Sequence, residues 1–229
     1  MKNNLLAALC VALGLTLCGL CIGGGITKMA NKDHHVTVKG LATRTVEADH
    51  AVWPLHFGIA GNDLQSLYTD RERVSREIHN LLIKQGFAES DIRDGNVSVE
   101  NNWSNYYGDH RPEHHYSLSA SVVVSTDDVM RVVNSRGCES SLLNQGIIVN
   151  THDWQVEYQY NGLAELKPEM IEEATKNARA VAQKFADDAD CRLGRLTSAS
   201  QGQFSIESDE FQPWIKYVRV VTTVNYQLD

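Results

Sequence analysis

Hydrophobic residues recur at helical spacing in residues 166–190, LKPEMIEEATKNARAVAQKFADDAD. The apolar positions, three or four residues apart, are Met170, Ala174, Ala178, Val181, Ala182, Phe185 and Ala189. Positions at this spacing share one face of an α-helix. Pro168 suits the first helical turn, where its missing N–H removes no helical hydrogen bond. Because most of this face is alanine, we expect the helix to lie close against a flat surface, and a β-sheet is the expected partner.

The C-terminal residues 216–228, KYVRVVTTVNYQL, instead alternate with a period of two, which is typical of a β-strand. One face of this strand would carry Val218, Val220, Thr222, Val224, Tyr226 and Leu228. We expect this strand to supply the sheet on which the alanine-lined helix packs.

Strand and helix patterns also alternate through the earlier part of the chain. Further strands are expected at residues 36–46, 51–59, 94–103, 116–125, 147–160 and 195–206. Asn62 and Thr126 are the expected N-caps of two further helices, and Gly86 and Gly137 are their expected stops. Pro54 favours an edge position or a bulge for the second strand.

This order of elements predicts an α+β fold. Its sheets would be mainly antiparallel, with helices packed on one face and a transmembrane or signal helix before them. Residues 1–30 would form the membrane anchor or signal segment, and residues 36–229 one folded domain.

The N-terminal segment Leu5–Ile26 carries no charged residue. At about 1.5 Å per residue, a helix of this length spans the hydrocarbon core of a bilayer. A cleaved signal peptide is the alternative, but the following residues, GGGITKMANKDHH, contain no good A-x-A cleavage site. We therefore expect an uncleaved anchor.

Four longer segments, in order, are VTVKGLATRTVEADHAVW, KPEMIEEATKNARAVAQKFA, GRLTSASQGQFSI and PWIKYVRVVTTVNYQL. They begin at Val36, Lys167, Gly194 and Pro213, and they resemble the bacterial SIMPL-domain family. The resemblance implies an α+β domain of SIMPL type in an exported or envelope-associated protein. It also implies self-association in some members and a link to stress tolerance, but no established catalytic residues. We therefore expect an inner-membrane anchor with the domain facing the periplasm. Secretion into the periplasm after cleavage is the alternative.

The net charge of the chain limits the classes of partner that it can bind. The whole chain has a formal net charge of −8, and residues 1–35 carry +2. The residues after 35 therefore carry a net charge of −10. Binding of nucleic acid needs a basic surface, so we expect no nucleic-acid partner.

We expect a homo-oligomer, because the anchor would concentrate subunits in the membrane and an edge strand offers unpaired backbone groups to a second copy. The second strand is the expected edge, and protein partners other than a second copy stay unidentified.

Catalytic motifs are missing from the sequence, which has no G-x-S-x-G, H-E-x-x-H, P-loop or C-x-x-C. We therefore expect a non-enzymatic envelope protein without a cofactor, and a periplasmic ligand- or metal-binding module is the alternative. His110, His114 and His115 are the candidate metal ligands, because imidazoles and carboxylates gathered in one loop can hold a transition metal. A solvated hairpin tip is the other interpretation of this loop.

Three further groups of residues have an ordinary structural interpretation beside a functional one. Glu47 and Asp49 are either paired carboxylates or part of a turn. The segment 201–204 is either a binding cluster or part of a sheet in which Gly202 marks a bulge or a close backbone approach. Cys138 and Cys191 are the two cysteines of the folded part, and an exported location permits a disulfide between them. The sequence leaves that pairing open.

Overall fold

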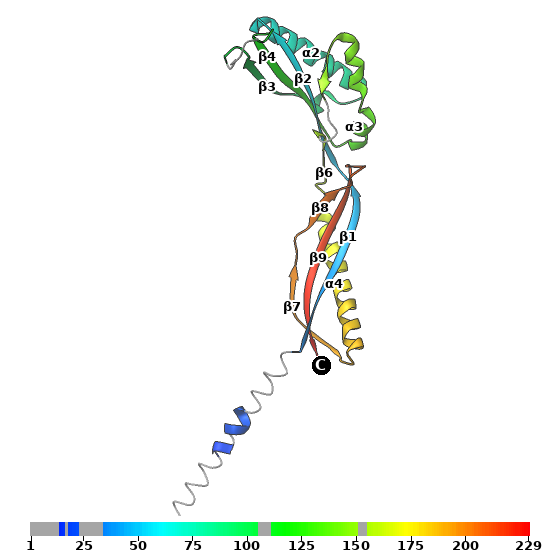
Figure 1. Cartoon of the computed structure of the whole chain (residues 1–229). Helices are drawn as coiled ribbons and strands as arrows, with labels where there is room; N and C mark the ends of the chain where they lie inside the picture. The colour runs from blue at the N-terminus through cyan, green and yellow to red at the C-terminus, as the bar shows by residue number, and fades with distance from the viewer. Residues whose placement is uncertain (1–13, 17, 23–33, 105–110, 151–154) are drawn as a thin grey trace, which may run out of the picture. The chain divides into compact units, whose positions relative to one another are not determined.

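The computed structural model describes residues 14–16, 18–22, 34–104, 111–150 and 155–229 (Figure 1). By its internal contacts the chain divides into two compact units. The first unit comprises Met1–Arg44, Leu166–Ile206 and Val218–Asp229. The second comprises Thr45–Glu165 and Glu207–Tyr217. Helices pack beside antiparallel strands, which confirms the predicted α+β class.

The first sheet has the strand order β1-β9-β7, and β8 also pairs with β9. The strands are β1 (His35–Glu47), β7 (Leu193–Gln201), β8 (Ser205–Ser208) and β9 (Ile215–Leu228). Strand β9 therefore lies inside this sheet. The residues of β9 predicted to share a buried face are buried from Val218 to Tyr226, and the last of them, Leu228, is half-buried: Val218, Val220, Thr222, Val224, Tyr226 and Leu228.

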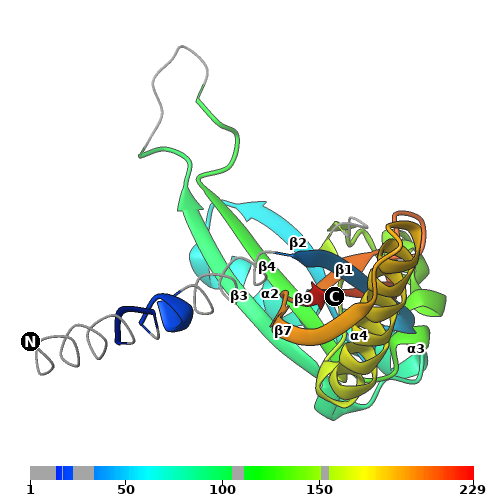
Figure 2. The same ribbon diagram turned by 90° about the horizontal axis from the view of Figure 1, so that it is seen from below.

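Helix α4 (Leu163–Asp188) runs along one face of this sheet (Figure 2). Its buried residues are Met170, Ala174, Ala178, Ala182 and Ala186. This strip follows a spacing of four, so the predicted members Val181 and Phe185 are instead 40% and 57% exposed, and Ala189 is also exposed. Around Ala174 and Ala178 the helix lies so close to Gly40 of β1 that only small side chains fit beneath it, and the larger neighbours Val181 and Phe185 project past the contact.

The start of α4 also differs from the prediction. The helix begins at Leu163, so Pro168 lies beyond the first turn. The carboxylate of Asp49 accepts hydrogen bonds from the backbone N–H groups of Asn161 and Gly162, at 2.8 and 2.9 Å. These bonds hold the N–H groups at the entrance of the helix, which otherwise have no helical acceptor. Asp49 is therefore a structural residue that fixes where the helix begins.

The second sheet has the strand order β3-β4-β2-β5, with β6 also paired to β2. The strands are β2 (His50–Gly61), β3 (Ile92–Asn101), β4 (Tyr116–Thr126), β5 (Val149–Asn150) and β6 (Glu157–Gln159). The hairpin of β3 and β4 confirms the prediction. The strand expected at 147–160 is divided into β5 and β6, and residues 151–154 lie outside the described part.

The expected edge position of β2 is wrong, because β2 lies inside the sheet. Pro54 pairs with Val123 of β4. On the other side of β2, β6 pairs with residues 50–52 and β5 pairs with residues 56–57. Pro54 falls between these two partners, which is how an interior strand accommodates a residue without an N–H donor.

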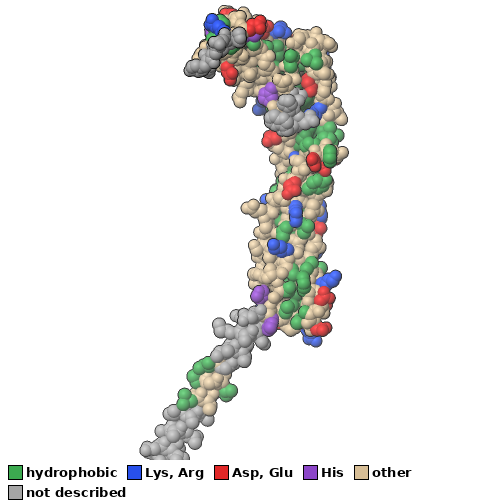
Figure 3. Space-filling model, in the orientation of Figure 1, with side chains coloured by type: hydrophobic (Ala, Val, Ile, Leu, Met, Phe, Trp, Pro, Cys, Tyr) green, Lys and Arg blue, Asp and Glu red, His purple; other side chains and the backbone are tan. Residues whose placement is uncertain are grey.

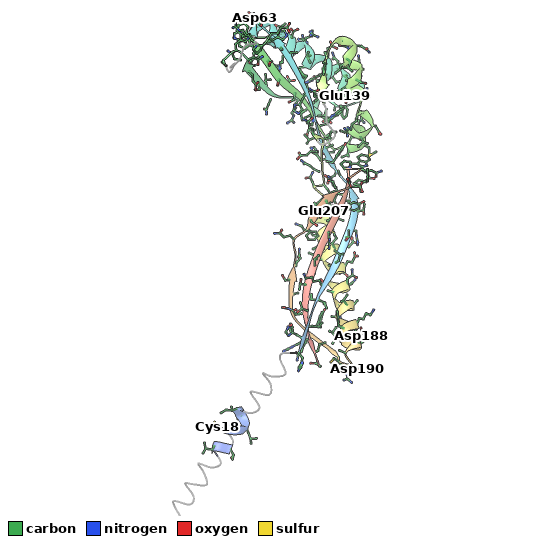
Figure 4. The ribbon with its side chains drawn as sticks, viewed as in Figure 1. Cys18, Asp63, Glu139, Asp188, Asp190 and Glu207 are labelled. Carbon is green, nitrogen blue, oxygen red and sulfur yellow. The ribbon has the colours of Figure 1, made fainter. Side chains whose placement is uncertain are left out.

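Helix α2 (Leu64–Lys84) covers one face of the second sheet with Leu67, Val74, Ile78 and Leu82. Its N-cap is Asp63, labelled at the start of the helix in Figure 4, and not Asn62. Asp63 accepts from the Ser66 N–H at 2.8 Å, whereas Asn62 Oδ1 accepts from the backbone of His115 at 2.8 Å. Gly86, with φ +90°, follows the end of the helix as predicted.

Shorter helices complete the second unit. Helix α3 (Val129–Ser135) has Asp128 as its N-cap in place of the expected Thr126, since the Asp128 carboxylate accepts from the Arg131 N–H at 3.0 Å. The predicted stop Gly137 has φ +90°. Two 3₁₀ segments that the sequence pattern did not predict are η1 (Glu89–Asp91) and η2 (Cys138–Gln145).

The segment expected as one strand at 195–206 is divided into β7 and β8. The division falls at Gly202, whose N–H donates to the Val221 carbonyl at 2.8 Å. A Cβ at Gly202 would lie 2.7 Å from that same oxygen, which confirms the expected close backbone approach. The glutamine-rich segment beside it therefore includes ordinary sheet hydrogen bonding.

Most of the expected anchor Leu5–Ile26 lies outside the described residues. Its described parts, residues 14–16 and 18–22, are helical and exposed. Among the residues that the structure describes, no helix is both long enough and apolar enough to cross a bilayer.

Candidate functional site

The second sheet has one apolar face and one polar face. Trp53, Leu55 and Phe57 of β2 point with α2 into the core, so the alternate residues of β2 and β4 lie on the opposite face. We call this opposite face the serine face, because β3 and β4 contribute to it Ser98, Ser117, Ser119, Ser121 and Ser125. Three of the four serines of β4 on this face alternate without interruption, and Val123 separates them from Ser125.

A pocket of about 410 Å³ opens on the serine face. Its polar lining comes from four strands and consists of His56, Asn96, Ser98, Ser119, Ser121 and Asn150. A register shift in β3 between Asp94 and Val97 brings Asn96 into this lining. All of these groups are hydroxyls, amides or an imidazole, and the lining contains no carboxylate, lysine or arginine. Such a lining favours an uncharged ligand rich in hydrogen-bonding groups.

The imidazole of His50 connects Ser125, near the end of β4, with Asp127, which follows that strand. Its Nδ1 lies 2.7 Å from Asp127 Oδ1, and its Nε2 lies 3.0 Å from Ser125 Oγ. This is the connectivity of a Ser-His-Asp hydrolase triad. The acid of such a triad is buried, however, whereas the Asp127 side chain is 90% exposed. Water therefore competes for the Asp127 carboxylate, and the geometry fixes the orientation of His50 at the start of β2.

Asp94 receives three partners from one face of α2. Ser75 donates a short hydrogen bond to its carboxylate, Arg71 Nη2 lies 3.1 Å away, and His79 Nε2 lies 3.4 Å away. Partial burial raises the pKa of Asp94, but the Ser75 hydrogen bond and the positive charge of Arg71 outweigh burial and lower it. Together with neighbouring side chains these residues line an open pocket of about 440 Å³. We call the four residues the Asp94 cluster.

Sequence reasoning missed the Asp94 cluster, although one signal was present. Arg71, Ser75 and His79 stand four residues apart, so they share a helix face. Arg71 is the charged exception in the apolar stripe of α2. The sequence pattern does not reveal that Asp94 of β3 contacts these three residues of α2, because the contact joins two different elements.

The predicted metal ligands are only partly within the described structure. His110 lies outside the described residues. His114 is exposed, and its carbonyl accepts from the Asn102 side chain at 3.0 Å. Among the described residues, no group of three histidine, cysteine or acidic side chains is arranged to hold a metal ion. The metal site at His110, His114 and His115 stays a prediction.

His115 takes part in a stack of rings at the end of the β3–β4 hairpin. Its ring centroid lies 3.9 Å from that of Trp103 and 3.9 Å from that of Tyr116. The guanidinium carbon of Arg111 lies 3.4 Å from the Trp103 centroid, which is cation–π geometry. Both faces of the imidazole are thus covered, and its backbone N–H is held by Asn62. The stack gives the end of the hairpin a defined aromatic surface.

Cys138 and Cys191 are both free thiols. Burial and the nearby charge of Glu139 raise the pKa of Cys138 to about 11. Cys191 is exposed, and its Sγ lies 3.4 Å from the Ala189 carbonyl. The disulfide that the sequence left open is therefore not present in this structure.

Comparison with known proteins identifies the family. The SIMPL family model, described as a protein of unknown function (DUF541), matches residues 36–220. No curated protein matches the chain. The matched range includes nearly all of β1, the serine face, the Asp94 cluster, α4 and the first part of β9. Because the match covers more than half of the 229 residues, this chain belongs to the SIMPL family, whose function is unknown.

Proposed function

We propose that this protein is an inner-membrane-anchored cell-envelope protein that self-associates through the edge of its second sheet, with its folded part in the periplasm. The observation that carries the self-association is the position of β3. Among the described strands, β3 stands at the end of the order β3-β4-β2-β5. Val97 and Val99 of this edge strand are each 38% exposed.

An edge strand presents unpaired backbone groups along one side, and a second copy of the same strand can pair with them. The register shift between Asp94 and Val97 disrupts the first half of β3, so the regular part begins at Val97. Antiparallel pairing centred on Val99 would place the two copies of Val99 opposite each other and Ser98 opposite Glu100. No like charges oppose each other in this register. Apolar cross-strand pairs of this kind contribute about 0.2–1 kcal/mol each.

Charge opposes this assembly. The chain after residue 35 carries a net charge of −10, so two copies repel each other at low ionic strength. Salt screens that repulsion with a Debye length of about 8 Å at physiological ionic strength. The proposal therefore requires association to strengthen as salt is added. An anchor at Leu5–Ile26 would assist by confining the subunits to the membrane plane.

The test is to measure the mass of the full chain in detergent by light scattering at low and high salt, and to crosslink it in membranes. Intact N-terminal mass in the membrane fraction tests the anchor separately. We expect an oligomer whose population grows with salt. A monomer under both salt conditions, with no crosslinked species in membranes, contradicts self-association. A mature N-terminus after Ile26 contradicts the anchor and leaves the association to be judged by itself.

The pocket on the serine face favours a second candidate function, which is binding of an uncharged polar ligand. Its floor is open at Gly58, where an added Cβ would approach only the Leu118 carbonyl, at 3.8 Å. The test is thermal stabilisation of the full chain by a panel of uncharged sugars and polyols. Ser119→Val removes a lining hydroxyl and should abolish any stabilisation, whereas Thr43→Val, at an exposed strand position on the first sheet, should preserve it. Equal loss in both variants would contradict binding at this pocket.

A further inference from the structure

A third pocket lies within the first unit, on the face of its sheet away from α4. It has a volume of about 370 Å³, and its lining is His34, His35, Arg195, Thr197, Asn225 and Gln227. Val224 and Tyr226 of β9 face the helix, so Asn225 and Gln227 point to the opposite side. We call this the histidine–arginine pocket.

Hydrogen bonds fix the walls of this pocket. The backbone N–H of Leu228 donates to the His34 carbonyl at 2.9 Å, which joins the end of β9 to the start of β1. Thr197 Oγ1 donates to the Asn225 carbonyl at 3.0 Å, and Asn225 Nδ2 donates to Ser198 Oγ at 2.6 Å. Three strands are thereby held together around the lining side chains, so the pocket is built by the sheet itself.

The chemistry of the lining is that of an anion site. It contains one guanidinium, two imidazoles and the side-chain amides of Asn225 and Gln227, and it contains no carboxylate. The Thr197 hydroxyl is already donated to the Asn225 carbonyl. Arginine forms paired hydrogen bonds with phosphate oxygens. The rest of the chain after residue 35 has a net charge of −10, so this concentration of basic side chains departs from the general character of the domain.

Acidic groups at the same end of the unit lie outside this lining. Asp188 and Asp190 stand at the end of α4, on the other side of the sheet (Figure 4). The Asp229 carboxylate lies beside Gly194, where an added Cβ would be 2.9 Å from Asp229 Oδ2. These charges repel anions from the surroundings, which makes a soluble anion a poor occupant and favours one that is held close by another force.

The position of the pocket along the chain supplies that force. His34 follows Ile26 by eight residues, and such a length of chain reaches at most about 29 Å. Figure 3 shows histidine side chains at the end of this unit where β1 begins. If Leu5–Ile26 is a membrane anchor, the histidine–arginine pocket is tethered next to the lipid headgroups. Their phosphates then have a high effective concentration at the pocket.

We propose that the histidine–arginine pocket binds the phosphate of an anionic phospholipid headgroup, with Arg195 as the charged ligand and His34 and His35 as neighbouring donors. This proposal rests on the proposed anchor. Occupation of the pocket would orient the folded part at the membrane surface. The anchor alone only limits the distance between them.

The test uses the full chain in phosphatidylcholine vesicles with and without phosphatidylglycerol. Native mass spectrometry after mild extraction counts the phosphatidylglycerol molecules that the protein retains. Arg195→Gln should reduce retention about fivefold, because one basic side chain near an anionic membrane contributes roughly 1 kcal/mol. Arg219→Gln is the matched control, since it removes the same charge from an exposed position of β9 outside the pocket. It should leave retention unchanged.

Equal retention in the wild type, Arg195→Gln and Arg219→Gln would overturn the proposal. A second arm adds glycerol 3-phosphate to protein in neutral detergent and follows the imidazole signals by NMR. Release of retained phosphatidylglycerol as the imidazole signals saturate supports the pocket as the site that holds the lipid. Saturation of those signals with no release of the lipid places the lipid elsewhere and overturns the proposal. Flotation with neutral vesicles tests the anchor independently, so failure of the anchor is distinguished from failure of the pocket.

Discussion

Gly40 of β1 lies directly beneath Ala178 of α4. A Cβ added at Gly40 would lie 2.8 Å from the Ala178 Cβ and would overlap the Ala174 carbonyl oxygen. Ala178 is fully buried, and the side-chain amide of Asn177 donates to the Leu41 carbonyl at 2.8 Å beside it. The backbones of the strand and the helix therefore approach as closely as the smallest side chains permit. This contact explains why the buried strip of α4 is alanine.

Replacing Gly40 by alanine should destabilise the first unit severely. The added methyl group meets backbone atoms of α4, which cannot move aside like the end of a flexible side chain, so the cost should reach or exceed the roughly 1–3 kcal/mol typical of overpacking. Chemical denaturation monitored by circular dichroism measures it. Gly58→Ala is the control, because its Cβ would meet only the Leu118 carbonyl at an ordinary 3.8 Å. Equal stability of the two variants would contradict the close contact.

Ala178→Leu tests the same contact from the helix side. The leucine adds three carbons at a fully buried position, so we expect a loss of about 1–3 kcal/mol in the free energy of unfolding. Arg179→Ala, at the adjacent exposed position, should change it by less than about 0.5 kcal/mol. A melting temperature unchanged by Ala178→Leu would show that the alanine strip is not buried.

Asp94→Asn should weaken the attachment of α2 to β3. The variant loses the negative charge that attracts Arg71, and we expect a loss of about 1–2 kcal/mol in the free energy of unfolding, limited by the 44% exposure of the Asp94 side chain. Asp70→Asn, which removes a surface pair with Arg73 at 3.4 Å on the same helix, should cost less than about 1 kcal/mol. If the two variants have the same free energy of unfolding, the cluster contributes no more than an exposed ion pair.

The same cluster predicts a dependence on pH. The pKa of Asp94 is lower in the folded protein than its ordinary value, so its ionised form stabilises the fold at pH above about 3.9, the unfolded value. That contribution is lost as the pH falls through the folded pKa. The stability difference between the wild type and Asp94→Asn should therefore shrink as the pH falls below about 4. A difference that grows on acidification would contradict the assignment.

Val99→Lys should reduce self-association if β3 is the interface. A lysine on an edge strand places a charge where a second strand would have to pair, a common protection against edge pairing. Light scattering at high salt should show a shift toward monomer. Val181→Lys is the control, because Val181 of α4 is 40% exposed and Val99 is 38% exposed. If the control lowers the oligomer population equally, net charge and not the β3 edge governs assembly.

Cys138 and Cys191 should differ in reactivity toward iodoacetamide. The thiolate is the reactive form, and the pKa of half-buried Cys138 is about 11, so little thiolate is present there at pH 8. The exposed Cys191 should be alkylated first, as peptide mapping by mass spectrometry would show. Rapid labelling of both thiols in the folded protein would contradict the burial of Cys138, and recovery of a linked peptide pair would contradict their free state.

The candidate sites differ in how far the sequence could lead to them. Arg71, Ser75 and His79 show a common helix face by their spacing, but their shared carboxylate comes from another element. The serine face follows in principle from the alternation of β4. The pocket on it depends on the register shift that moves Asn96. The sequence makes His115 a candidate metal ligand by its chemistry, and the structure adds that its ring stacks between Trp103 and Tyr116.

The sequence by itself determined the properties that depend on side-chain period. Alternation along β9 and β2 decided which residues face the core, because neighbouring side chains of a strand must point to opposite sides. Gly86 and Gly137 marked helix ends, because glycine readily adopts the positive φ found there. Gly202 marked a close backbone approach, because a side chain there would meet the Val221 carbonyl. Only the tertiary structure decided the rest. Pro54 fits an interior strand because two short partners leave room at its position. Val181 and Phe185 are exposed because the contact between α4 and Gly40 is too narrow to cover them, and that width is set by the partner strand and not by the helix.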